Sequence, residues 1–432
     1  MRSVFLVFLI VGGWAMGGFE TGIDSVLKAA KKDKRPILIS FYGIWCPPCN
    51  EMEETVFETT SFHKKAKAFH LLKVDADSPK SWGIKDKYKV GGYPTVIFTN
   101  ANGEEIYRFV GYRSPAEVSR AMDLVLSAKG KDVSKACDST SEDDLWRCGL
   151  ICAERKQHDC ATTAFTKLET KLKPGSFRYF EARTYFVEHA GNSELKRLGY
   201  EKLLAEAPTY PKALQWAMDY LDLFDTTVTE PAPKKELLEK VLAAVPQMRS
   251  DSRTEELGIP LTDILQAQAT ILAKLGRPEE SKAVWAESAT LLGKLASEFK
   301  SARGYTLERI SCLREAGQEE AALKLANEYR TKYPEEFTFH FAAASLLKSV
   351  KKYNDAIPIA KRAYEVSYGD NRIRSATLLV DLFATVPDKE SARKYFEEVT
   401  SYIKPDASLE VRTHRYLKKL KEAWAAIGTK VG

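Results

Sequence analysis

The chain has 432 residues, of which 44% are hydrophobic and 29% are charged, and its formal net charge is +6. This balance is typical of a globular protein and excludes a largely disordered chain, while the length predicts two or three domains. The charge is modest for the length, and the sequence has no block of basic residues interleaved with aromatics. We therefore expect no nucleic-acid partner.

The sequence pattern of residues 1–17 predicts a signal peptide. An apolar run extends from Val4 to Val11, and Ala15 and Gly17 lie three and one residues before an expected cut at Gly18. An uncleaved anchor is the alternative, but the run is shorter than the about 20 residues that a spanning helix needs. We expect secretion across a membrane, no stable membrane span, and a compartment in which disulfides persist.

The order of expected helices and strands in residues 18–128 predicts one α/β domain. The closing helix has Ser114 as its N-cap and Pro115 at its first position. A hairpin turns at Asn102 and Gly103. In chain order the pattern predicts a helix (23–36), a buried strand (36–42), a helical segment (49–68), a strand ending in acids (69–77), the hairpin (93–112) and the closing helix (114–129).

A polar linker is expected at 129–140, and the pattern of residues 141–432 predicts an all-α region. Pro174 and Pro208 fall at breaks between helix pairs, and the interval between them equals the interval from Pro334 to Tyr368. Small residues occupy positions where paired helices approach closely, among them Ala360. The shared interval is the period of tetratricopeptide repeats, so the pattern resembles a solenoid of such repeats. An irregular helical bundle is the alternative.

The stretch "ISFYGIWCPPCNEME" places Cys46 and Cys49 where a strand ends and a helix begins. Backbone N–H groups and the helix dipole favour a thiolate at Cys46. Cys49 lies one turn on, so Cys46 can attack a substrate disulfide and Cys49 can resolve the mixed disulfide. Pro47 and Pro48 lack N–H groups, which reduces the donors around Cys46 and predicts a pair that leans towards a reductant.

Two alternatives for this pair are half of a zinc site and an inert structural disulfide. The sequence has no second CxxC and no paired histidine spacing nearby, so we expect no metal. Pro94 enters a predicted strand, which is unusual without a special role. A cis Tyr93–Pro94 bond would present the backbone of Tyr93 beside Cys46 to an extended substrate, which favours the redox interpretation.

Residues 20–127 resemble a thioredoxin-fold domain through Trp45-Cys46-Pro47-Pro48-Cys49 and Gly92-Tyr93-Pro94-Thr95. Within that fold, "CPPCNEMEETVF" is similar to the C-terminal domain of the transmembrane thiol–disulfide reductant conductors of the bacterial periplasm. The resemblance implies a periplasmic location, with Cys46 as the nucleophile, Cys49 as the resolving thiol and Pro94 as the cis-proline. Glu53 would be the acid that tunes proton transfer. We expect the substrate surface to consist of Trp45, Gly92, Tyr93 and Pro94. Thioredoxins carry a buried Asp where this chain has Ser40, which puts the rate in doubt more than the reaction.

Four further cysteines, Cys137, Cys148, Cys152 and Cys160, fall close together in the sequence, and their spacing matches no metal template. Structural disulfides are expected in an exported protein. Bridges from Cys137 to Cys148 and from Cys152 to Cys160 fit the predicted helices, although three pairings are possible. The alternative is a second exchange site that passes electrons to or from Cys46. The last cysteine, Cys312, is expected to be a buried core thiol.

These patterns together predict an exported thiol–disulfide oxidoreductase that needs no cofactor. Its partners would be protein thiol or disulfide substrates and a redox partner, with the helical repeats recruiting a partner or client. Two other functions stay open: a non-catalytic binding or assembly factor, and a disulfide isomerase.

Overall fold

The computed structural model describes residues 18–127, 137–155, 157–226, 232–251, 259–299, 301–386, 388–403 and 411–429. The expected signal peptide and residues 129–136 of the expected linker lie outside the described residues. Within these described ranges, none of the helices has the length and apolar character needed to cross a membrane.

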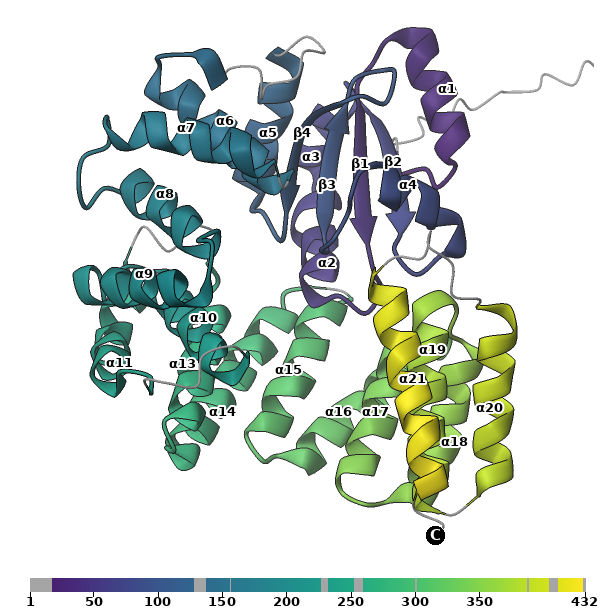
Figure 1. Cartoon of the computed structure of the whole chain (residues 1–432). Helices are drawn as coiled ribbons and strands as arrows, with labels where there is room; N and C mark the ends of the chain where they lie inside the picture. Colours follow the sequence, from purple (N-terminus) through teal and green to yellow (C-terminus); the bar gives the residue numbers. More distant parts are fainter. Residues whose placement is uncertain are drawn as a thin grey trace, which may run out of the picture.

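The N-terminal domain contains a four-stranded sheet in the order β2-β1-β3-β4 (Figure 1). Strand β1 pairs in parallel with β2 and antiparallel with β3, and β3 pairs antiparallel with β4. The strands span Ile37–Tyr42 (β1), His70–Asp75 (β2), Thr95–Thr99 (β3) and Glu105–Val110 (β4).

Helices cover both faces of this sheet, because side chains along each strand alternate between its two faces. In β1, Leu38 packs on one face, and Ile39 packs on the other. The face that includes Leu38 is covered by α2 (Pro47–Met52), the π-helical turn η1 (Glu53–Phe57), α3 (Thr60–Ala66) and α5 (Pro115–Ser127). The other face is covered by α1 (Ile23–Asp33) and α4 (Trp82–Lys87), and α4 is not among the predicted elements.

The helical region, by which we mean α6 to α21, contains only helices among its described residues, so the fold class predicted from the sequence is confirmed. The interval from the start of α15 to the start of α17 equals that from the start of α16 to the start of α18, and both match the tetratricopeptide period. The bounds are α6 (Glu142–Glu154), α7 (His158–Glu169), α8 (Phe177–Glu188), α9 (Ser193–Glu206), α10 (Ala213–Thr226), α11 (Lys235–Ser250), α13 (Leu261–Lys274), α14 (Pro278–Ala296), α15 (Arg303–Glu315), α16 (Glu319–Lys332), α17 (Phe337–Ser349), α18 (Tyr353–Glu365), α19 (Gly369–Thr385), α20 (Lys389–Tyr402) and α21 (Val411–Thr429).

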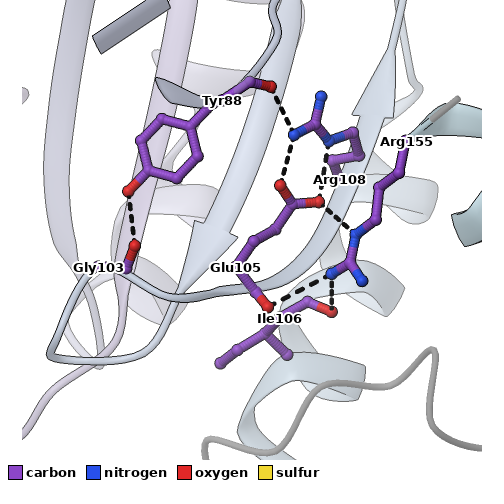
Figure 2. A network of polar contacts seen from close by, with 6 residues as sticks. All are labelled: Tyr88, Gly103, Glu105, Ile106, Arg108 and Arg155. Carbon is purple, nitrogen blue, oxygen red and sulfur yellow. Dashed lines mark hydrogen bonds and ion pairs between the residues drawn. The ribbon is translucent and has the colours of Figure 1, made fainter. Parts of the chain in front are cut away.

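The helical region starts beside β4, curves away from the N-terminal domain, and returns to it beneath α2 (Figure 1). Its first anchor is a largely buried ionic network at the β4 edge (Figure 2). Arg155, at the end of α6, donates to Glu105 Oε1 at 2.6 Å and to the carbonyl of Ile106 at 3.2 Å. Arg108 binds the same carboxylate and donates to the carbonyl of Tyr88 at 2.7 Å.

Burial alone would raise the pKa of Glu105, but hydrogen bonds and charge from Arg108 and Arg155 outweigh it and hold that pKa below its usual range. The carboxylate therefore stays ionised and binds both guanidinium groups. This anchor fixes the first helix of the helical region to the sheet.

Candidate redox site

Cys46 lies at the N-cap of α2, after the short turn that follows β1, in an extended backbone conformation. Its sulfur is bonded to that of Cys49, with the two Cα atoms 5.2 Å apart. The amide of Cys49 donates to Cys46 Sγ at 3.2 Å. Because Pro47 and Pro48 have no N–H, the amide of Cys49 is the first in this helix that can stabilise a thiolate at Cys46.

The loop before β3 packs against Trp45, the residue that precedes Cys46. The Tyr93–Pro94 peptide bond is cis, and Gly111 donates to the carbonyl of Pro94 at 2.8 Å. Trp45 packs edge-on against Tyr93, with the ring centroids 6.0 Å apart. Gly92 accepts a hydrogen bond at its carbonyl from the Thr95 hydroxyl at 2.8 Å, which ties down the turn ahead of Pro94. The structure therefore brings Trp45 together with the turn that carries Gly92, Tyr93 and Pro94, the residues expected to form the substrate surface.

Glu53 lies in the π-helical turn that follows α2 and forms an ion pair with Lys73 of β2 at 2.6 Å. Lys73 is the register partner of Ser40, the buried residue that stands where thioredoxins carry an acid. Among the described residues, neither Glu53 nor Ser40 forms a side-chain hydrogen bond with a cysteine.

Helix α15 packs directly against α2. A Cβ added to Gly304 would lie 2.7 Å from the carbonyl oxygen of Pro47, so only glycine allows this approach without a shift. Next to it, the hydroxyl of Tyr305 donates to Glu51 Oε1 at 3.0 Å. Cys46 is only 3% exposed and Cys49 only 6% exposed, so the redox pair is covered in this arrangement.

Helix α19 makes a second contact on the same face. Asp77, in the loop after β2, accepts hydrogen bonds at Oδ2 from Trp45 Nε1 at 2.7 Å and from Asn371 Nδ2 at 2.8 Å. Arg374 lies over the Trp45 ring at 5.9 Å from its centroid. At Gly369, which has a positive φ of 53°, an added Cβ would lie 1.6 Å from the carbonyl oxygen of Asp77. Sequence reasoning did not predict Gly369, Asn371 or Arg374 as part of this face, because no local pattern links positions so far apart in the chain.

Carboxyl groups with altered proton affinity lie along the contact between α2 and the helical region. Burial raises the pKa of Glu51 to about 7, although its hydrogen bond from Tyr305 opposes the rise. Burial likewise raises the pKa of Glu308 to about 7 and that of Asp263 to about 6. These groups repel one another when charged, so the contact favours their protonated forms.

Residues 23–126 match the family model described as a thioredoxin-like domain. This part of the chain is a thioredoxin-like domain. Over 96 residues the chain is 27% identical to the thiol:disulfide interchange protein DsbD 1 of Pseudomonas aeruginosa, covering 22% of this chain and 16% of that protein. Over 94 residues it is 31% identical to the disulfide bond reductase DsbH of Chlamydia pneumoniae, covering 19% of this chain and 56% of the relative.

The matched segment is only one part of each protein. The chain spans 16% of the length of the Pseudomonas relative and 56% of the length of the Chlamydia relative. A solved tetratricopeptide repeat protein from Parabacteroides merdae superposes with a TM-score of 0.39 at 13% identity, covering 65% of this chain and 98% of that one.

The second group of cysteines is brought together around the start of the helical region. Cys137 is bonded to Cys148, and Cys152 is bonded to Cys160. Cys148 and Cys152 lie one turn apart on α6, and Cys160 lies in the first turn of α7. The fifth cysteine outside the redox pair, Cys312, is a buried thiol in α15 whose pKa burial raises to about 11.

Proposed function

We propose that the chain is an exported thiol–disulfide oxidoreductase that exchanges disulfides with protein substrates through Cys46 and Cys49. The observation that supports this most directly is the position of Cys46, at the N-terminus of α2 and in a loop packed beside the cis Pro94 turn. Two disulfides outside the redox pair also support an oxidising compartment such as the bacterial periplasm.

The exchange transfers two electrons. In the reduced protein, the Cys46 thiolate attacks a substrate disulfide, forms a mixed disulfide and releases one substrate thiolate. Cys49 then loses its proton and attacks Cys46 Sγ, which forms the Cys46–Cys49 disulfide and releases the second substrate thiol. Glu53, paired with Lys73, is the candidate for tuning the proton on Cys49 through intervening water. A separate electron donor must reduce the pair again.

The pair is expected to lean towards a reductant. Because Pro47 and Pro48 have no N–H, only the amide of Cys49 in the first turn of α2 can donate a hydrogen bond to a thiolate at Cys46. The reduced state is therefore stabilised less than in a helix with three free amides in that turn. The reduction potential is expected nearer roughly −270 mV than roughly −120 mV.

The helical region is proposed to recruit a protein partner or client and to control access to Cys46. Its contacts through Gly304 and Gly369 cover the face on which a substrate must dock. A client therefore has to displace this contact before its disulfide reaches the sulfur of Cys46.

Insulin reduction by the full chain in the presence of dithiothreitol tests the activity. We expect turnover by the wild type, none by Cys46→Ser, and accumulation of a mixed disulfide with Cys49→Ser. Cys312→Ala serves as the matched control, because this thiol is buried away from the pair. A wild-type rate equal to that of Cys46→Ser would refute the oxidoreductase proposal and favour a binding factor.

A further inference from the structure

The four cysteines at the start of the helical region form one compact group of sulfur atoms. We call Cys137, Cys148, Cys152 and Cys160 the four-cysteine cluster; their sulfur atoms all lie within 4.8 Å of one another. Sulfurs of different disulfides are in contact: Cys137 and Cys160 at 3.5 Å, and Cys148 and Cys160 at 3.9 Å. Two independent structural disulfides do not require this convergence.

These separations are those of a four-thiolate zinc site. Zn–S bonds of about 2.3 Å in a tetrahedron place the sulfurs about 3.8 Å apart. Three contacts between the two disulfides, at 3.5 Å for Cys137–Cys160 and at 3.9 Å for Cys148–Cys152 and Cys148–Cys160, already lie close to this value. After reduction, the two bonded pairs need only separate from about 2.0 Å to about 3.8 Å.

The surroundings suit a closed metal site. Cys148 and Cys152 are fully buried among apolar side chains, including Leu145 and Phe165, which exclude competing water ligands. Cys160 lies in the first turn of α7, where backbone N–H groups favour negative charge. The partly exposed Cys137 and Cys160 give a reductant and a metal ion access to the cluster.

We propose that the four-cysteine cluster, once reduced, binds one Zn²⁺ ion. Reduction consumes one phosphine and one water molecule per disulfide, yielding a phosphine oxide and two thiols each time. The four thiols then bind Zn²⁺ and release four protons. Soft thiolate ligands in a tetrahedral arrangement select zinc over Mg²⁺ or Ca²⁺. The cluster would thus brace α6 against α7 in both states, with two disulfides when oxidised and a metal ion when reduced. This proposal is independent of disulfide exchange at Cys46 and Cys49.

The test uses the full chain, reduced anaerobically with a water-soluble phosphine, mixed with excess Zn²⁺ and freed of unbound metal by gel filtration. Metal analysis is expected to find one zinc per chain, and none in the unreduced protein. Co²⁺ in place of Zn²⁺ should give the absorption of tetrahedral thiolate coordination. Alkylation followed by mass spectrometry should show the four cysteines protected by zinc while Cys46 and Cys49 react.

Variants identify the ligands. Cys160→Ser should weaken zinc binding by more than about 100-fold, because loss of an outer-shell partner alone costs 10–100-fold. The double variant Cys46→Ser/Cys49→Ser is the matched control and should still bind one zinc, whether or not the proposed exchange activity exists. The proposal is overturned if the reduced wild type binds no zinc, or if Cys160→Ser binds zinc as tightly as the wild type. It is also overturned if the double variant loses zinc binding, or if the four-cysteine cluster stays oxidised while the Cys46–Cys49 disulfide is reduced.

Discussion

Replacing Gly304 by alanine should open the covered redox face. The added Cβ would lie 2.7 Å from the Pro47 carbonyl oxygen and 3.1 Å from the Glu51 amide nitrogen, and neither backbone atom can rotate away. Ordinary contact begins near 3.4 Å, so α15 and α2 must separate by about 0.7 Å. Overpacking of this kind costs about 1–3 kcal/mol.

This energy acts on the docking equilibrium. Alanine also favours helix formation, but α15 is expected to remain helical whether or not it is docked, so that gain cancels between the two states. A weakening of about 1–3 kcal/mol raises the undocked fraction roughly 5- to 150-fold. If attack on the Cys46–Cys49 disulfide requires undocking, the rate of that attack rises by the same factor.

The assay measures how fast dithiothreitol reduces the Cys46–Cys49 disulfide in the full chain, by alkylation and quantification of the peptide that carries both residues. Gly191→Ala is the matched control, because an added Cβ there meets nothing within 4 Å. The Cys152–Cys160 disulfide provides an internal reference in each sample. Equal rates for Gly304→Ala and Gly191→Ala, with melting temperatures preserved, would show that Cys46 is reached without separating α2 from α15.

Two further substitutions probe the contacts of the helical region. Burial raises the pKa of Glu51 from 4.5 to about 7. The stabilisation that its proton gives the folded state is therefore complete below pH 4.5 and is lost as the pH rises through 7. Urea titrations should find this decline in the free energy of unfolding reduced in Glu51→Gln and unchanged in the exposed control Glu58→Gln. Arg155→Met removes one partner of the largely buried Glu105 and should lower the free energy of unfolding by about 1–3 kcal/mol. The control Arg147→Met removes an exposed ion pair and should cost about 0–1 kcal/mol. Equal losses in the two variants would refute a special role for the Arg155 anchor.

The sequence predicts features that short segments determine by themselves. Ser114 caps α5, exchanging hydrogen bonds with Glu117 as a capping box. The strand, the cysteine pair and the helix that follows are adjacent in the chain, so their pattern is sufficient to position Cys46. The placement of Cys148 and Cys152 on one helix face follows equally from their positions one helical turn apart.

The covered face could not be predicted in this way. In the sequence, Gly304 and Gly369 show only the low helix propensity of any glycine. Their role as close-approach positions depends on the path of the whole helical region. In repeat proteins small rotations between successive helices accumulate, so the position of α15 relative to α2 depends on all the preceding helices. Asp77 was recognised as an acid at a strand end, but its partner Asn371 is 294 residues away.

The two ends of the helical region are held with different strength, which indicates how the redox face opens. At the β4 edge, Arg155 and Glu105 form a largely buried ion pair, and we expect the loss of Arg155 to cost about 1–3 kcal/mol. At the redox face, Glu54 Oε2 is buried without a hydrogen-bond partner among the described residues, and burial disfavours the charge on Glu51. We therefore expect separation to be easier at α2 than at β4, even though Glu54 Oε1 accepts hydrogen bonds from Ser301 and Arg303. An opening motion would pivot near α6, exposing Cys46 while the four-cysteine cluster holds α6 and α7 together at the pivot.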